Sequence, residues 1–348
     1  MKPYTALGLF SGGLDSILAC RVIADQGIRV IGLKFVSPFF DYDLLSRREE
    51  YKQSVQQQYG IEVEVIDISR PYLRMLAQPA HGFGKHFNPC IDCKILMLIQ
   101  ARELLQSYEA SFLISGEVLG QRPMSQRRDT LRVIERDSGC TGMLLRPLSA
   151  GLLPPTLAEQ NGLVDRQRLY TFSGRGRRQQ KELAARLGIT GYPAPAGGCM
   201  LTDPNLATRI RQYVKDGYNG KNEAQAVDDV RLLVMGRQFC LHGDIWFVIG
   251  RDEQENNQLE TMRQPGDWLL RMTRRPGPLG LLRQGETLLA DAAREKKILP
   301  LLAGIIIRYG KKIDGKLPEA EVTIDKGSEM IRGRFVPRTD DEIHPWQI

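Results

Sequence analysis

Residues 5–16 read Thr-Ala-Leu-Gly-Leu-Phe-Ser-Gly-Gly-Leu-Asp-Ser, and this stretch decides the fold of the first part of the chain. Its apolar first half predicts a buried strand, and a helical pattern begins near Leu14. Between the two, Gly12 and Gly13 lack a Cβ atom, so the backbone can turn sharply there and bring its N–H groups close to an anion. Because helix N-termini favour phosphate, a strand, a tight turn and a helix start together predict a phosphate site.

Three polar side chains belong to this turn. Ser11 and Ser16 add hydroxyl donors for a phosphate. Asp15 would repel a phosphate by itself, so it predicts a magnesium ion or an amino group nearby. The simpler alternative is an ordinary glycine turn with a Ser/Asp helix cap. The complete Ser-Gly-Gly-Leu-Asp-Ser string after a strand favours the phosphate site.

The string at residues 11–16 resembles the SGGxDS signature of the PP-loop ATP pyrophosphatases. That resemblance implies ATP and Mg²⁺ as cofactors, adenylation of a substrate oxygen with Asp15 in a catalytic role, and release of pyrophosphate. It leaves the substrate open. The ATP-binding residues that it implies are Phe10, Ser11, Gly12, Gly13, Asp15, Ser16, Lys34, Gly116 and Gln121.

Length and composition exclude several classes of protein. A chain of 348 residues is long for one domain and predicts two or three. It shows neither a signal-like start nor an apolar run of membrane-spanning length, which predicts a cytoplasmic protein without membrane contact. Six cysteines without a secretion signal argue for thiol, metal or redox use rather than a disulfide scaffold. The net charge of +7 suits a polyanionic partner.

Strand and helix patterns alternate through the first part of the chain. This alternation predicts an α/β fold with a doubly wound, mainly parallel sheet, PP-loop and HUP-like in type, that binds its ligand at the carboxyl ends of the strands. The predicted strands are Thr5–Phe10, Ile28–Phe35, Glu62–Ile66 and Phe112–Ser115, and the predicted helices include Ile17–Ile23, Leu45–Gln58, Ile95–Leu105 and Thr208–Val214.

Cys90 and Cys93 stand three residues apart where a helix is expected to begin. Both thiols can point to one spot there, and the helix N-terminus is expected to lower their pKa. The pair is compatible with a redox site, half a zinc site, part of an iron–sulfur site, or two buried apolar residues. Cys199 follows the glycines at 197 and 198 in a loop that can approach a ligand closely. Three thiolates without a nearby fourth cysteine or histidine match a cluster with one open iron better than a closed zinc site.

Two further segments resemble tRNA-thiolating enzymes. Residues 113–121, Leu-Ile-Ser-Gly-Glu-Val-Leu-Gly-Gln, with Arg-Pro-Leu at 146–148, resemble the bacterial 4-thiouridine synthetases. Residues 88–94, Asn-Pro-Cys-Ile-Asp-Cys-Lys, are similar to the NPDxxCN segment of the 2-thiouridylases. This similarity implies that Cys93 and Cys199 are catalytic, whereas Cys90 occupies the position of that family's aspartate. The three cysteines also resemble the pattern of PP-loop thiolases that hold a [4Fe–4S] cluster with three cysteines. That resemblance implies that Cys90, Cys93 and Cys199 are metal ligands.

The last third of the chain predicts a smaller α+β domain. Residues 248–259, Val-Ile-Gly-Arg-Asp-Glu-Gln-Glu-Asn-Asn-Gln-Leu, resemble the VGRNxxQND string of NFACT-R domains, which are implicated in RNA binding. Short strands are expected at Val230–Met235, Gln238–Leu241, Ile245–Ile249, Trp268–Met272, Leu301–Arg308 and Ala320–Ile324. Positive charge on loops is expected from Arg274, Arg275, Arg308, Lys311, Lys312 and Lys316.

These features predict three regions. Residues 1–172 form the PP-loop ATP-binding domain, and residues 173–221 form a basic helical segment with the Cys199 loop, packed on the first domain. Its basic run at 173–186 is compatible with a solvated helix face or with contacts to a phosphate backbone. A polar stretch at 217–221 predicts a linker, and residues 222–348 form the NFACT-R-like domain.

The predicted function is ATP-dependent tRNA thiolation. ATP adenylates a uridine carbonyl oxygen, and sulfur from a [4Fe–4S] cluster or a persulfide on Cys199 then displaces AMP. The expected partners are tRNA and a sulfur donor, either sulfide or a cysteine desulfurase, and a homodimer is possible. Two alternatives stay open: a PP-loop enzyme that activates a small carboxylate or amide, and a non-catalytic RNA-binding protein with a vestigial nucleotide site.

Overall fold

A computed structural model describes residues 4–194, 199–215 and 222–348, and the chain divides into two compact units, Met1–Glu223 and Ala224–Ile348. The residues before Cys199, at 195–198, and the linker expected at 217–221 lie outside the described residues. Within the described part, no helix combines the length and apolar character needed to cross a membrane.

The first unit is built on a parallel sheet of five strands in the order β3-β2-β1-β4-β5. The central strands are buried on both faces, as their runs of Leu, Ile, Val and Phe require. This sheet confirms the predicted α/β fold class. The strands are β1 (Thr5–Leu9), β2 (Arg29–Val36), β3 (Glu62–Asp67), β4 (Phe112–Ser115) and β5 (Leu144–Leu145).

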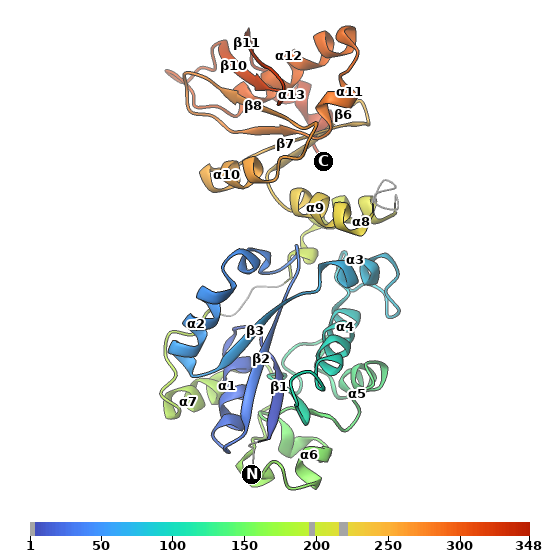
Figure 1. Cartoon of the computed structure of the whole chain (residues 1–348), viewed down its shortest axis with the longest axis vertical. Coiled ribbons are helices and arrows are strands. Elements are labelled where there is room, and N and C mark those ends of the chain that lie inside the picture. Colours follow the sequence, from blue (N-terminus) through green and yellow to red (C-terminus); the bar gives the residue numbers. More distant parts are fainter. Residues whose placement is uncertain (1–3, 195–198, 216–221) are drawn as a thin grey trace. The chain divides into compact units, whose positions relative to one another are not determined.

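Helices cover both faces of this sheet (Figure 1). On one face, side chains of α1, α2 and α7 share a hydrophobic core with the strands. On the other face lie α3, α4 and α5. The bounds are α1 (Leu14–Ala24), α2 (Arg48–Tyr59), α3 (Ser69–Ala77), α4 (Cys90–Glu103), α5 (Arg128–Asp137), α6 (Leu157–Gln160), α7 (Arg178–Arg186) and α8 (Pro204–Lys215).

The strand order brings two distant loops together. From β1 the chain moves outward through β2 and β3, and it returns on the other side of β1 with β4. Leu9 near the end of β1 therefore stands opposite Ser115 at the end of β4. Such a reversal of strand order opens a crevice at the carboxyl ends of the strands, where doubly wound folds bind ligands. The turn at residues 10–16 and the loop that starts at Gly116 both lie at this reversal.

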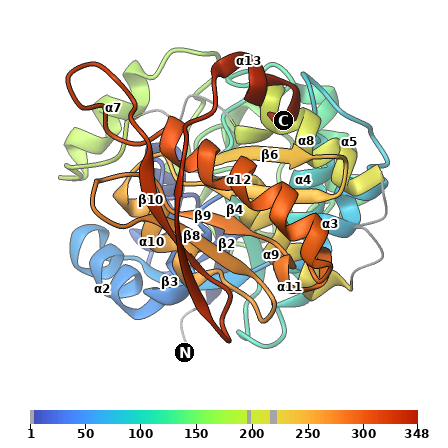
Figure 2. The same cartoon turned by 90° about the horizontal axis from the view of Figure 1, so that it is seen from above.

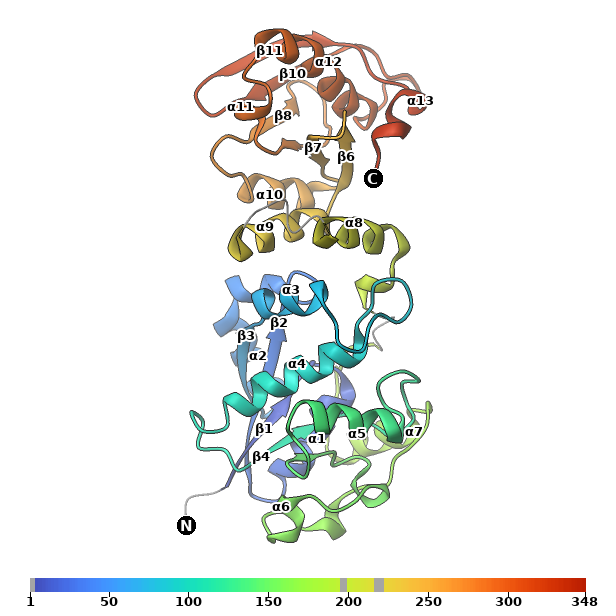
Figure 3. The ribbon, with the colours of Figure 1, turned by 90° about the vertical axis from the view of Figure 1, so that its right-hand side faces the viewer.

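The second unit contains an antiparallel sheet of six strands in the order β11-β10-β8-β9-β7-β6. Alternate side chains of its strands pack on α12 and on the pair α9 and α10, so helices cover both faces (Figures 2 and 3). The strands are β6 (Arg237–Leu241), β7 (Ile245–Ile249), β8 (Trp268–Met272), β9 (Gly280–Leu282), β10 (Ala320–Asp325) and β11 (Met330–Phe335). The helices are α9 (Glu223–Leu233), α10 (Glu253–Thr261), α11 (Gly285–Leu288), α12 (Ala292–Arg308) and α13 (Asp340–Ile343).

Two strand predictions in this unit were wrong. The segment Val230–Met235 belongs to the end of α9 and the turn after it, and Leu301–Arg308 is the second half of α12. Side chains from Ile298 to Ile307 are almost all buried, so this part of the helix is apolar nearly all round. A short apolar run of this kind, rich in β-branched residues, has no periodicity that separates a helix from a strand.

Candidate active site at the end of the first strand

The turn after β1 has the phosphate-binding geometry at Gly12 rather than at both glycines. Gly12 has φ +81, a left-handed conformation that glycine adopts at little cost. Gly13 is extended with φ −79 and precedes the first residue of α1. Of the two glycines expected in this turn, only Gly12 is left-handed. The Gly13 N–H donates to Ser11 Oγ at 3.3 Å, and Ser16 Oγ donates to the Gly13 carbonyl at 2.8 Å.

Lys34 lies against this turn from the neighbouring strand β2. Its ammonium donates to the Ser11 carbonyl at 2.9 Å and forms an ion pair with Asp41 at 2.5 Å. The side chain is almost fully buried, with 6% of its surface exposed. Lys34 thus adds a positive charge next to the turn, as its predicted role in ATP binding requires. Asp41 was not singled out from the sequence.

Asp15 stands between the two loops of the crevice. Its Oδ2 accepts a hydrogen bond from Gln121 Nε2 at 2.9 Å, while its buried Oδ1 has no hydrogen-bond partner among the described residues. A Cβ atom on Gly116 would lie 2.5 Å from the Asp15 carbonyl, so only glycine allows the loop after β4 to approach this closely. Magnesium is commonly held by one or two carboxylates together with substrate phosphates. The orphaned Oδ1 fits that role.

Two cavities meet at the turn. The smaller one, of about 290 Å³, is lined by Ser11, Asp15 and Lys34 together with Cys93, Lys94 and Glu117. The larger one, of about 1070 Å³, is lined by Gly12 and Gly13 together with Cys90, Gln121 and Arg177. Phe10, Ser11, Asp15, Lys34, Asp41 and Arg122 line both cavities. The predicted ATP residues therefore gather at the same place as two of the predicted cysteines.

The larger cavity also has basic side chains. Arg47, Arg122 and Arg177 line it, and the buried Nε of Arg177 has no hydrogen-bond partner among the described residues. Arg177 belongs to the basic run at 173–186, whereas Arg178 in the same run is exposed and pairs with Glu182. One part of that run thus reaches the site and another part is a solvated helix face. Guanidinium groups bind phosphate oxygens well, so these arginines can contact phosphates. The carboxylates of Asp15, Asp41 and Glu50 line the same cavity, so its charge is mixed.

Cys90, Cys93 and Cys199 come together around a buried tyrosine. Each thiol interacts electrostatically with the other two, and all three interact with Tyr72 of α3. The expectation that the start of α4 lowers thiol pKa is wrong for Cys93, because burial raises its pKa to about 11, although the Tyr72 hydrogen bond and Lys94 act in the opposite direction. Burial also raises the pKa of Cys199. Tyr72 was missed in the sequence, which gives no sign that α3 packs on α4.

These thiols were tested as ligands for a metal centre. Cysteine is the residue type that holds iron–sulfur clusters, and the three thiols are near neighbours. Within residues 4–194, 199–215 and 222–348, however, no group of three or more His, Cys, Asp or Glu side chains is arranged to hold a metal ion. In this arrangement the three thiols therefore do not fit a cluster.

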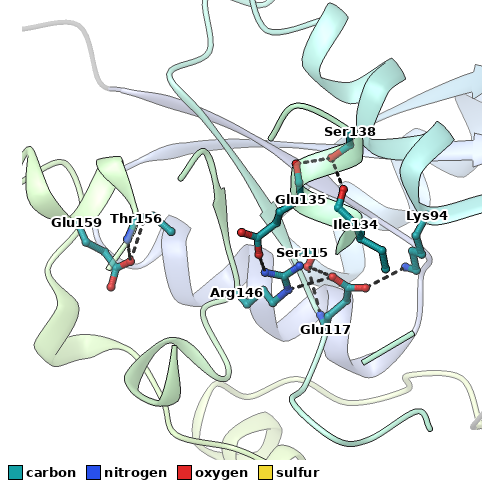
Figure 4. Close-up of polar contacts among 9 residues, drawn as sticks. All are labelled: Lys94, Ser115, Glu117, Ile134, Glu135, Ser138, Arg146, Thr156 and Glu159. Carbon is teal, nitrogen blue, oxygen red and sulfur yellow. Dashed lines mark hydrogen bonds and ion pairs between the residues drawn. The ribbon is translucent and has the colours of Figure 1, made fainter. Parts of the chain in front are cut away.

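Glu117 forms a buried ion-pair network beside the small cavity (Figure 4). Its Oε2 accepts hydrogen bonds from Ser115 Oγ and Arg146 Nε, both at 3.1 Å, and Arg146 also pairs with Glu135. Burial raises the pKa of Glu117, but the charges of Arg146 and Lys94 outweigh it, so the net pKa is lowered. Glu117 is therefore ionised at neutral pH and can only accept hydrogen bonds. Neither Glu117 nor Lys94 was predicted as a site residue, although both lie inside the segments that resemble thiolating enzymes.

Two family models match this chain, one within each of its two compact units. Residues 3–151 match the family described as thiamine biosynthesis protein (ThiI), and residues 236–347 match the NFACT protein RNA binding domain. A ThiI-family PP-loop domain is thus followed by an NFACT-R domain. The family of the first domain implies ATP binding. The family of the second domain is described as RNA-binding.

Relatives of the ThiI-type domain are distant. The chain is 25% identical over 142 residues to a probable tRNA sulfurtransferase of Thermococcus kodakarensis, a match that covers 41% of this chain and 36% of that protein. It is 21% identical over 266 residues to the tRNA-specific 2-thiouridylase MnmA of Listeria monocytogenes serotype 4b, covering 71% of this chain and 68% of that one. A crystal structure of a 4-thiouridine synthetase–RNA complex with bound ATP is 19% identical with a TM-score of 0.35, covering 66% of this chain and 53% of that one.

Proposed function

We propose that this protein is an ATP-dependent tRNA thiolase that adenylates a uridine carbonyl oxygen and replaces it with sulfur. The observation that carries the proposal is that Ser11 and Asp15 of the phosphate turn line the same cavity as Cys93. The reaction needs an activated oxygen and a thiol that completes sulfur transfer close to the same carbon atom, and Cys93 has that second role in the steps below. Cys199, which carries the sulfur in those steps, is not among the residues that line either cavity. The RNA-binding second domain and the tRNA-modifying relatives support tRNA as the substrate, and the cytoplasm as its location.

In the proposed first step, the turn and Lys34 bind the phosphates of ATP, and Mg²⁺ on Asp15 offsets their charge when it is bound. The uridine oxygen attacks the α-phosphate, and pyrophosphate leaves. AMP on the former carbonyl oxygen is a good leaving group, so the ring carbon becomes open to a nucleophile.

In the proposed second step, a cysteine desulfurase transfers sulfane sulfur to Cys199 as a persulfide, and Cys93 completes the transfer. The terminal sulfur attacks the adenylated carbon and AMP leaves. The Cys93 thiol then attacks Cys199, which releases the thiolated base and leaves a disulfide for an external thiol to reduce. The electrostatic contact between the two thiols supports this pairing. Sulfide, the other predicted donor, would instead attack the adenylated carbon directly and displace AMP.

The test uses the full chain, ATP, and tRNA from cells that lack the protein, with pyrophosphate release and thionucleosides measured together. We expect Asp15→Ala to lose both products, whereas Asp25→Ala, at the far end of α1, keeps both. Cys93→Ala and Cys199→Ala should release pyrophosphate without forming a thionucleoside, and Cys240→Ala should be unaffected. An active Asp15→Ala variant would contradict the assignment. Pyrophosphate release with a small carboxylate or amide in the absence of tRNA would favour the enzyme that activates a small molecule. If no substrate led to pyrophosphate release, the non-catalytic RNA-binding protein would be favoured.

Iron content of anaerobically purified protein tests the cluster that the sequence predicts. A brown protein that loses its iron in each of the Cys90→Ala, Cys93→Ala and Cys199→Ala variants would establish the cluster and displace the persulfide step. Full thiolation activity without iron would establish the opposite.

A further inference from the structure

The carboxylate of Glu117 has one oxygen engaged and one free. Its Oε2 is held by Ser115 and Arg146, whereas its buried Oε1 has no hydrogen-bond partner among the described residues. The nearest positive charge to Oε1 is Lys94 Nζ at 3.9 Å, beyond hydrogen-bond distance (Figure 4). Leaving a buried acceptor without a donor is unfavourable, because its desolvation is not compensated. A ligand that donates a hydrogen bond at this position would remove that cost.

Glu117 and Lys94 line the small cavity together with Cys93. An ionised carboxylate only accepts hydrogen bonds and an ammonium only donates them. Among the polar side chains that line this cavity, Glu117 and Lys94 thus place an acceptor beside a donor, and both line it together with the Cys93 thiol. Its volume of about 290 Å³ lies at the lower end of ligand pockets, roughly 300–1,000 Å³. This size suits a single base better than a whole nucleotide.

We propose that Glu117 and Lys94 select the target base, with Glu117 Oε1 accepting the N3–H of a uracil ring and Lys94 donating to a carbonyl beside it. This inference rests on the proposed function and specifies its substrate. Uracil carries a carbonyl, an N–H and a second carbonyl in a row, which matches a donor next to an acceptor. Cytosine has a lone pair at N3, and the carboxylate repels it.

The adenine ring of ATP also places an amino donor next to a ring-nitrogen acceptor. The position of Cys93 favours the target base, because Lys94 follows it directly on α4 and both line the cavity. Sulfur must reach the carbon of the base that is modified, whereas the adenine ring of ATP is unchanged by the reaction. Recognition of adenine instead is one outcome of the test below.

The test measures equilibrium binding of uridine, 3-methyluridine and cytidine to the full chain by ligand-detected NMR. We expect the wild type to bind uridine about tenfold more tightly than the other two nucleosides, as one hydrogen bond to a charged group implies. In Glu117→Gln, the amide oxygen must accept from Arg146 and Ser115, so the amide nitrogen takes the place of Oε1. The variant should therefore lose the preference for uridine and bind cytidine at least as well.

Glu135→Gln is the matched control. Glu135 also pairs with Arg146, but its side chain is 22% exposed and is not among the residues that line the small cavity. It should keep the preference for uridine and the affinity for ATP. Thermal unfolding of both variants shows whether either loses its fold. A third variant, Lys94→Met, removes the donor and leaves Glu117 in place. It should weaken the binding of uridine without strengthening the binding of cytidine.

Three outcomes would overturn the inference. The first is equal binding of uridine and 3-methyluridine by the wild type, and the second is an unchanged uridine preference in Glu117→Gln. The third is a loss of ATP affinity in Glu117→Gln with unchanged nucleoside preference, which would assign Glu117 to adenine. A separate result would contradict the proposed function, namely the absence of pyrophosphate release with tRNA. Nucleoside binding does not depend on pyrophosphate release, so the two proposals can fail independently.

Discussion

At the level of single residues, Gly116 controls how closely the loop after β4 approaches Asp15. We predict that Gly116→Ala lowers stability by about 1–3 kcal/mol, as overpacking of a tight contact does. A Cβ there would lie 2.5 Å from the Asp15 carbonyl and 2.6 Å from the Ser16 nitrogen, and backbone atoms cannot move aside cheaply. Chemical denaturation measures the loss, and ATP titration measures the accompanying loss of affinity.

Gly13→Ala is the control for this prediction. A Cβ on Gly13 would meet Ser11 Oγ at 3.4 Å, an ordinary contact, and the residue does not need a positive φ. It should fold with near wild-type stability. If both alanine variants were equally stable, the close approach of the two loops would be refuted.

The residues of the turn could be named from the sequence because the motif is local. Glu117 could not, because its importance depends on Arg146, which is 29 residues away and packs against it only in the folded sheet. The same limit applies to Tyr72, whose hydroxyl lies among the three thiols although nothing near it in the sequence carries thiol chemistry.

At the level of elements, the first turn of α4 carries Cys93 in a partly buried position. Because its pKa is raised to about 11, the thiol is protonated at pH 7. We predict slow alkylation by iodoacetamide at pH 7, with a rate that rises about tenfold per pH unit because only the thiolate reacts. The rise should continue until the pH nears this value. Mass spectrometry of the modified peptide follows the reaction at each pH.

Tyr72→Phe provides the companion measurement. The Tyr72 hydrogen bond lowers the pKa of Cys93, so its removal should slow alkylation further at every pH below 11. A rate that levels off below pH 9 would show that the pKa of Cys93 lies below 9 and would contradict the assignment.

Elements of the first unit were predictable because short apolar runs alternate with amphipathic helices and glycine turns. The helix α12 was not, because Ile305, Ile306 and Ile307 are buried together and their β-branched side chains are typical of strands. Tertiary burial on the sheet, rather than local preference, makes this segment helical. The helix predicted from Ile95 begins at Cys90 in the structure, so the two cysteines lie within its first turn. The burial that raises the pKa of Cys93 depends on packing that no local pattern reveals.

For the whole molecule, the net charge of +7 comes from residues 1–223, because residues 224–348 contain 19 Lys and Arg against 19 Asp and Glu. Within the second unit, positive charge is concentrated locally. Arg274, Lys311, Lys312 and Lys316 are exposed on two loops that touch, since the Lys311 N–H donates to the Pro276 carbonyl at 3.1 Å. Arg308 was expected on a loop as well, but it ends α12 and pairs with Asp340.

We predict that Lys311→Ala/Lys312→Ala weakens tRNA binding and lowers the slope of log affinity against log salt by about 1–2, since each phosphate contact contributes about 0.7–0.9. ATP affinity should not change. Filter binding over a range of salt concentrations measures both quantities. Lys296→Ala/Lys297→Ala, an exposed pair on α12, is the control and should bind tRNA as the wild type does. Equal effects from both pairs would show a general charge effect and no RNA-contacting loop.

The reversal of strand order between β1 and β4 also has a consequence for synthesis on the ribosome. The phosphate turn is translated first, but Gly116, Arg177 and Cys199 emerge one after another much later. More than half of the first unit is therefore translated after the turn at residues 10–16 and before Cys199, the last cysteine of that unit. Under the proposed function, sulfur transfer must wait until the segment that contains Cys199 has been synthesised and has folded, so the order of translation by itself delays that step.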